Sequence, residues 1–310
     1  MLDIFLQTLP FFMLIALGYG SGRTGFFSEE ATAYLTKFVF YFALSAMLFR
    51  FSANLSLSVI LKWDFVFAYL SATAFVYIIA TIVALRRKVP VTEAAIEAQC
   101  AVIGNVGFLG IPMLVLLLGQ GAVGSIMMVL AVDLIVFGSL VVILITGARD
   151  GRASLRVLGT VFTGLIKNPM IVSIGLGLLA SAYNVPIPGP VNSFLELLGA
   201  AATPGALFAI GASLAGKSAE RVAVAGWLTF CKLVLHPAAV AVAALLIFDV
   251  NPYAAGVMIA AAALPVAGNV YIIAQHYMVA PARASAAIFL STVASVVTLS
   301  VVIALVIRLG

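Results

Sequence analysis

The residues from Glu93 to Leu118 form an apolar segment that is interrupted where a membrane-spanning helix should be most regular. Its main part, AAIEAQCAVIGNVGFLGIPMLVLLL, covers residues 94–118. A continuous helix of this length would measure about 39 Å, whereas the hydrocarbon core of a bilayer is about 30 Å thick. The residues that interrupt the segment are Gly104, Asn105, Gly107, Gly110 and Pro112. We therefore predict a spanning helix that is broken near the middle of the membrane.

A second apolar segment carries the same interruption. The tripeptide GNV at residues 104–106 recurs at residues 268–270, which is 164 residues later (268 − 104), and it follows Pro265. Trp63 and Trp227 are separated by the same offset (227 − 63 = 164). Broken helices at matching positions in two halves of a chain indicate the binding site of a secondary transporter. Because five crossings separate the two copies, the second copy should be inverted relative to the first.

The composition is that of a membrane protein. Hydrophobic residues make up 64% of the 310 residues and charged residues only 9%, against about 25% in soluble domains. The formal charge of +5 does not predict nucleic-acid binding, because the basic residues gather in loops beside apolar segments. Cys100 and Cys231 lie within apolar segments without a CxxC spacing, so we expect no disulfide framework, no metal site and no cofactor. The first apolar segment, after Asp3, is expected to be retained.

Ten segments meet the criterion of about 20 mostly apolar residues. They cover residues 4–21, 31–51, 63–85, 93–118, 121–146, 168–184, 191–215, 222–248, 253–278 and 284–308. Capping residues at Ser28, Thr92 and Asn251 are expected to begin three of these helices. The resulting organisation is a first five-helix repeat in residues 1–147, a linker in residues 148–167 and a second, inverted five-helix repeat in residues 168–310.

The basic residues predict the orientation in the membrane, because Lys and Arg in short loops collect on the cytoplasmic side. Eleven of the sixteen Lys and Arg residues follow the odd-numbered spans. Both termini should therefore lie outside a bacterial inner membrane, and the loop at residues 147–167 should be cytoplasmic. Within that loop, LRVLGTVFTGLIKN at residues 155–168 is expected to form an amphipathic helix along the membrane surface.

A broken helix can bind an anion without a formal charge, because the first N–H groups of its second half are unpaired and carry partial positive charge. Asn105 and Asn269 each add a carboxamide that can orient a carboxylate. The predicted substrate-binding residues are Asn105, Asn269, Gly104, Gly107, Pro112, Pro265 and Gly268. The alternative is that the glycines only allow close helix packing and the prolines only kink the helices. The pairing of two breaks with two asparagines favours a site.

Ionisable residues inside a predicted span are candidates for function because burying a charge is costly. Glu97, Asp133, Lys232 and His236 are candidates either for ion coupling within a supporting polar network or for purely structural ion pairs, and the sequence leaves both interpretations open. Lys37 and His276 are interpreted as side chains that extend toward a membrane interface.

Three motifs resemble those of the auxin efflux carrier family, namely NVGFLGIP at residues 105–112, NPMI at 168–171 and ALPVAGNVYIIA at 263–274. The family includes PIN-type auxin carriers of plants and bacterial malonate, malate or lactate permeases, and the resemblance covers essentially the whole chain. It implies a fold similar to sodium/proton antiporters and bile-acid symporters, with helices 4 and 9 crossing at the substrate site. It also implies a homodimer, a scaffold of helices 1, 2, 6 and 7, and a transport part of helices 3–5 and 8–10.

These observations together predict an all-α membrane transporter rather than an enzyme, because the sequence contains neither an HExxH motif nor a nucleophile motif. The expected cargo is a small organic carboxylate such as malonate, malate, lactate or an auxin-like acid. Transport would proceed by alternating access at the crossing of helices 4 and 9, with a proton as the candidate coupling ion. The alternative is a sodium-coupled organic-anion symporter on the same fold. The short linker favours a bacterial carboxylate carrier over a plant-type auxin carrier.

Overall fold

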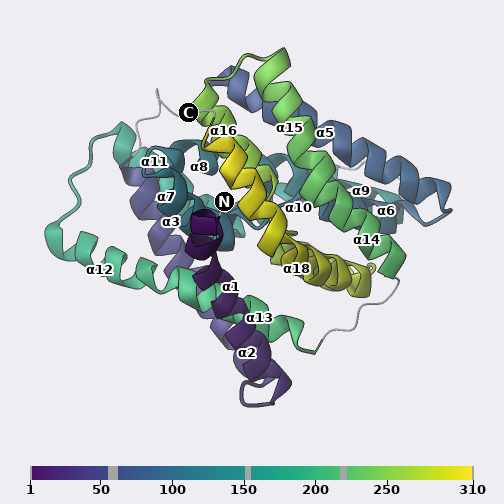
Figure 1. Ribbon diagram of the computed structural model, residues 1–310, viewed down its shortest axis with the longest axis horizontal. Coiled ribbons are helices and arrows are strands. Elements are labelled where there is room, and N and C mark those ends of the chain that lie inside the picture. Colours follow the sequence, from purple (N-terminus) through teal and green to yellow (C-terminus); the bar gives the residue numbers. More distant parts are fainter. Residues whose placement is uncertain (1, 55–61, 151–154, 217–221, 309–310) are drawn as a thin grey trace.

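The computed structural model describes residues 2–54, 62–150, 155–216 and 222–308, and the regular structure in this part of the chain is helical apart from one isolated bridge (Figure 1). Elements named η are π-helical turns. The first half of the chain forms α1 (Leu2–Arg23), α2 (Glu29–Phe38), η1 (Val39–Ala43), α3 (Leu44–Ala53), α5 (Trp63–Arg86), α6 (Val91–Val102), η2 (Val106–Gly110), α7 (Ile111–Leu118), α8 (Ala122–Val132), η3 (Asp133–Phe137) and α9 (Gly138–Asp150). The second half forms α10 (Leu155–Lys167), α11 (Pro169–Ala182), α12 (Gly189–Ala200), α13 (Ala202–Leu214), α14 (Val222–Phe230), η4 (Cys231–Leu235), α15 (His236–Val242), η5 (Ala243–Ile247), α16 (Pro252–Ala262), α17 (Gly268–His276) and α18 (Pro281–Val306).

The helices confirm an all-α protein with several membrane spans. Among the described residues, six helical runs are long and apolar enough to cross a bilayer: Glu29–Ala53, Trp63–Arg86, Ala122–Arg149, Gly189–Leu214, Val222–Ile247 and Pro281–Val306. A seventh is a pair bent by 69°, Val161–Lys167 with Pro169–Ala182. The other three of the ten predicted spans are α1 and the two segments with a GNV break. Those two are indeed interrupted, and they leave shorter apolar helices at Val106–Leu118 and Pro252–Ala262.

Two of the three predicted helix starts are confirmed. Ser28 accepts a hydrogen bond from the Ala31 N–H at 3.1 Å, and Asn251 accepts one from the Ala254 N–H at 3.4 Å. The third prediction, Thr92, is wrong, because α6 begins one residue earlier, with Pro90 in the N-cap position. Pro90 has an extended backbone (φ −57°, ψ 152°), so it lies outside the helix, which begins at the next residue. Proline is tolerated at this position because the first N–H groups of a helix have no partner within it.

The linker contains the predicted helix. α10 covers Leu155–Lys167, and its Phe162 and Ile166 side chains are exposed. Asn168 then accepts a hydrogen bond from the Met170 N–H at 3.0 Å and so caps the start of α11, where the chain turns by 69°. The location of α10 on a membrane surface stays a prediction.

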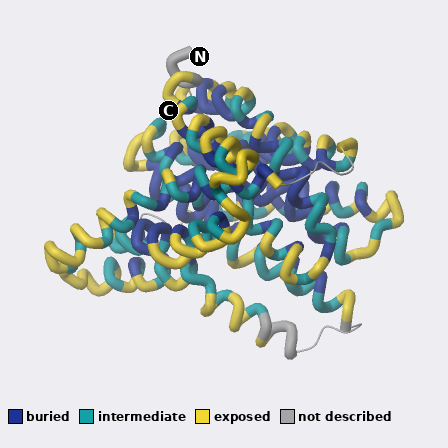
Figure 2. The backbone as a smooth tube through the Cα atoms, turned by 90° about the horizontal axis from the view of Figure 1, so that it is seen from below, coloured by how far each residue is buried: buried dark blue, intermediate teal, exposed yellow. Residues whose placement is uncertain are grey.

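Glycines on two neighbouring helices allow close packing of their backbones. α1 packs along α13, and a Cβ atom on Gly18 would lie 2.1 Å from the Phe208 carbonyl oxygen. A Cβ atom on Gly211 would lie 1.9 Å from the Ile15 carbonyl oxygen. Small residues at such contacts let two backbones touch, which is how helices associate in a membrane. Figure 2 shows buried residues gathered in the interior, while many large apolar side chains are exposed on the outer faces, as expected for surfaces in contact with lipid.

Candidate functional site

The two breaks meet at the centre of the fold. The first break joins α6 to η2 at residues 103–105, and the second joins α16 to α17 at residues 263–267. They pair as a short antiparallel bridge, in which the Asn105 N–H donates to the Pro265 carbonyl at 2.8 Å and the Ala267 N–H donates to the Ile103 carbonyl at 3.0 Å. Each unwound segment therefore satisfies the backbone of the other, which an unwound segment inside a membrane requires.

This crossing brings four helix ends together. α6 and α16 end there with carbonyl groups, whereas η2 and α17 begin there with N–H groups. Because the peptide dipoles add along a helix, the first two ends carry partial negative charge and the last two carry partial positive charge. The N-terminal ends of η2 and α17 are thus the ones suited to an anion.

Two glycines of the first break lie in close contact with their neighbours. A Cβ atom on Gly104 would lie 3.2 Å from the Ala261 carbonyl oxygen and 3.3 Å from Nζ of Lys232. A Cβ atom on Gly107 would lie 2.8 Å from Cε of Met170. The predicted glycines therefore allow the two broken helices and their neighbours to approach closely.

Lys232 lies on the negative side of the crossing. Its side chain is fully buried, and its ammonium group donates to the carbonyl of Ala262, the last residue of α16. Nζ lies 3.4 Å from Nδ1 of His236, whose Nε2 lies 3.0 Å from Oγ1 of Thr73. A positive charge at the C-terminal end of a helix is favourable, so Lys232 stabilises the broken end of α16.

Asp133 lies at the first residue of η3 and faces the crossing from another helix. The Tyr69 hydroxyl donates to Oδ1 of Asp133 at 2.8 Å, whereas Oδ2 has no hydrogen-bond partner among the described residues. Only 3% of Asp133 is exposed. Asp133 is therefore a buried carboxyl group with one oxygen that has no partner among the described residues.

Glu97 has a different environment. Its two carboxylate oxygens accept hydrogen bonds from Arg87 and from Arg283, the latter at 2.7 Å, and Arg283 also pairs with Glu93 at 2.7 Å. Its side chain is 1% exposed and is not part of the cavity wall described below. Glu97 thus joins α6 to the start of α18 and to the connection between α5 and α6.

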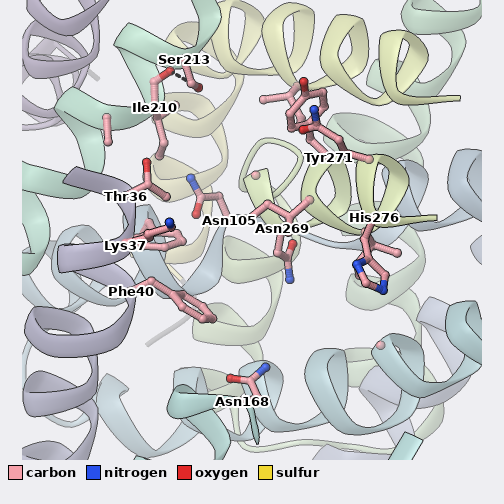
Figure 3. A pocket seen from close by; sticks show the side chains of 18 of the residues that line it. Thr36, Lys37, Phe40, Asn105, Asn168, Ile210, Ser213, Asn269, Tyr271 and His276 are labelled. Atoms are coloured by element: carbon pink, nitrogen blue, oxygen red, sulfur yellow. Dashed lines mark hydrogen bonds between the residues drawn. The ribbon is translucent and has the colours of Figure 1, made fainter. Parts of the chain in front are cut away.

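A cavity of about 1240 Å³ opens beside the crossing (Figure 3). Its wall contains Asp133, Gly268 and the two predicted asparagines, Asn105 and Asn269. A pocket of about 30 Å³ at the crossing is lined by Gly104, Gly107 and, again, Asn105, Asp133 and Asn269. The structure therefore brings both asparagines to one space.

Besides Glu97, four predicted residues line neither the cavity nor the small pocket. Pro265 contributes its carbonyl to the crossing, and Pro112 occupies the second position of α7, beyond the break. Lys232 and His236 lie behind the breaks and line neither space.

Several polar residues of the cavity wall were not predicted. Gln99 and Ser285 are 2% and 4% exposed, line the cavity, and have a side-chain oxygen without a partner in the described part of the chain, as does Asn269. Lys37 and His276, interpreted from the sequence as interface residues, line the same cavity. Gln99 and Ser285 are polar residues within apolar segments, and this was the only signal for them in the sequence. It does not indicate which side of a helix faces a cavity.

Comparisons with known proteins agree with this architecture. The family described as "Membrane transport protein" matches residues 3–303. A protein of Rhizobium meliloti (strain 1021) named "Putative malonate transporter" is 30% identical over 295 residues, which cover 94% of this chain and 92% of that protein. The "Uncharacterized transporter YfdV" of Escherichia coli (strain K12) is 27% identical over 316 residues, which cover 96% of both chains. The resemblance noted from the three motifs is confirmed: this chain belongs to the auxin efflux carrier family of membrane transport proteins.

Proposed function

We propose that this membrane transporter carries a small organic carboxylate anion, whose carboxylate binds between Asn105 and Asn269. The observation that carries the proposal is that two paired helix breaks present both asparagines to one cavity. The relative named as a malonate transporter supports malonate as the first cargo to test.

The chemistry of the crossing favours a carboxylate over a cation on the cavity side. The N-terminal ends of η2 and α17 supply N–H groups and partial positive charge, and each asparagine supplies a carboxamide that can donate two hydrogen bonds. A hydrogen bond to a charged group contributes about 1.5–3 kcal/mol. Two amides and a few N–H groups are therefore enough to offset the desolvation of one carboxylate.

The packing supports a division into a scaffold and a moving transport part. α1 packs along α13, α11 and α12 pack on α3, and α13 packs on α2, which corresponds to a scaffold of helices 1, 2, 6 and 7. α5 packs on α6 and α15, and α16 packs on α8 and α18, which corresponds to a transport part of helices 3–5 and 8–10. We propose ten spans in two inverted repeats, residues 1–147 and 168–310, with alternating access at the crossing and a homodimer assembled through the scaffold.

Proton coupling is the form of coupling that we propose. Asp133 has one unpartnered oxygen and lines the cavity, so it can exchange a proton with the space in which the substrate binds. Sodium coupling receives less support, because the ammonium group of Lys232 already neutralises the carbonyl end of α16, where a sodium ion would otherwise be stabilised.

Purified protein in liposomes tests the proposal. We expect uptake of labelled malonate by the native protein, and a loss of at least about tenfold in Asn105→Ala and in Asn269→Ala, because each removes a hydrogen bond to a charged group. Asp133→Asn should retain malonate binding but lose the response to a pH gradient. Native uptake that requires sodium would replace the coupling proposal with the sodium alternative. Uptake unchanged in both asparagine variants would refute the site.

A further inference from the structure

The cavity wall contains a cation that the asparagine site does not use. Lys37, near the end of α2, lines the cavity and is an exposed residue. Its Nζ lies 5.4 Å from the centre of the Tyr34 ring, a cation–π contact with a neighbour on the same helix. In the described part of the chain, no carboxylate forms an ion pair with Lys37. Its positive charge is therefore available to a ligand.

Lys37 lies close to the crossing along its own helix. Phe40 follows it by three residues, which is about 4.5 Å of helix rise and places the two side chains on the same face. Phe40 lines the small pocket between the breaks together with Asn105 and Asn269, and its ring centre lies 6.5 Å from that of Phe108 in η2. Figure 3 shows Lys37 and Phe40 on the purple helix that flanks the two asparagines.

Other charged groups also line this cavity. They are Glu29, Asp133, Lys167 and His276. Glu29 lies eight residues before Lys37 on α2, about 12 Å along the helix axis. The carboxyl of Asp133 is bonded to Tyr69 on one side. Lys167 ends α10. Figure 3 shows Lys37 beside Asn105, whereas His276 lies on the far side of Asn269. Lys37 is thus the cation best placed to act with the asparagines.

We propose that Lys37 binds the second carboxylate of a short dicarboxylate while Asn105 and Asn269 bind the first. This inference rests on the proposed function and sharpens it, because it names the substrate class as dicarboxylates rather than monocarboxylates. The ammonium group offers three donors and a full charge, whereas a neutral group at that end of the ligand would leave this charge uncompensated. Selectivity for the dianion then follows from one side chain on α2.

Two ligands of nearly equal shape test this assignment at neutral pH. Malonate carries two carboxylates, and monomethyl malonate carries one carboxylate and one ester. Binding of each to the purified protein in nanodiscs is measured by calorimetry. We expect the native protein to bind malonate about tenfold more tightly than the monoester, which corresponds to about 1.4 kcal/mol. Lys37→Met should weaken malonate binding by about tenfold and leave binding of the monoester unchanged. Lys37→Arg should preserve the preference for malonate over the monoester.

Two matched lysine variants complete the experiment. Lys62→Met removes an exposed lysine outside the cavity wall and should change neither affinity. Lys167→Met removes the competing cation and should also preserve the preference for malonate. A preference that survives Lys37→Met, or that disappears in Lys167→Met instead, overturns the assignment while the asparagine site stands. If the native protein binds neither ligand, the proposed function itself fails and this inference fails with it.

Discussion

Glu97 is a buried carboxylate whose two partners come from different elements, one near it in the sequence and one distant. Arg87 lies ten residues before it and Arg283 lies 186 residues after it. Arg283 is only 11% exposed and also pairs with Glu93. Removing one partner of a buried ion pair leaves an uncompensated charge, which is more costly than the pair is worth. This cluster is therefore a structural joint between α6 and α18.

The joint predicts a specific pattern of stabilities. Arg283→Met should lower the free energy of unfolding by about 3 kcal/mol, because Glu97 then has a single arginine partner. Adding Glu97→Gln to Arg283→Met should recover part of that loss, since the buried group is then neutral. Thermal or chemical unfolding in detergent micelles measures both effects.

Arg308→Met removes an exposed arginine near the C-terminus and provides the control, with an expected change below about 0.5 kcal/mol. If the double variant is less stable than Arg283→Met alone, the charge on Glu97 contributes nothing through Arg283 and the assignment as a joint is wrong.

Charged residues show how far single positions can be interpreted from the sequence. The cost of burying a charge made Glu97, Asp133, Lys232 and His236 candidates for function or for structural ion pairs. It could not identify the partners, because Lys232 bonds to a backbone carbonyl thirty residues away and such bonds have no signature in the sequence. Lys37 was interpreted as an interface residue for the same reason, since its orientation toward a cavity depends on how α2 packs.

The broken helices were predictable at the scale of elements because glycine, asparagine and proline weaken a helix. The five π-helical turns in the described residues were not, because a π-turn needs only one extra residue per turn and no particular residue type. Four of them carry residues of the site or its surroundings: Phe40 lies in η1, Gly107 in η2, Asp133 begins η3 and Lys232 lies in η4. Such turns often lie at functional sites, where they change the direction of a side chain.

The contact between α1 and α13 leads to a prediction for one helix pair. Gly18→Ala should destabilise the protein by about 1–3 kcal/mol, because the new Cβ atom would lie 2.1 Å from a backbone oxygen that cannot move unless α13 moves with it. Gly20→Ala, on the same helix with no atom within 4 Å of its Cβ position, should be neutral or stabilising by about 0.5–1 kcal/mol. Unfolding midpoints in detergent compare the two variants. Equal midpoints would contradict close packing at Gly18.

The sequence predicted the class of the whole molecule, but neither the number of complete spans nor the backbone pairing of the two breaks could be derived from it directly. Composition identified a helical membrane protein, and both predicted broken segments are interrupted. Helix length alone does not give the number of spans, because a broken span is divided into helices that are each too short to cross a bilayer. The meeting of the two breaks could be inferred only from their matching positions in the chain. Their backbone pairing became visible only in the fold, because it joins residues 160 positions apart (265 − 105).

The orientation in the membrane is a property of the whole chain and gives the last prediction. Eleven of sixteen basic residues follow odd-numbered spans, so the loop after α1 should be cytoplasmic and the turn after α11 should be outside. Phe26 and Tyr183 are 86% and 78% exposed in these two places. Because Cys100 and Cys231 are both buried, the native protein should react little with a membrane-impermeant maleimide. In intact cells Tyr183→Cys should be labelled at once, whereas Phe26→Cys should be labelled only after permeabilisation. The reverse pattern would place the termini in the cytoplasm, and the basic loops would then follow some constraint other than the charge rule.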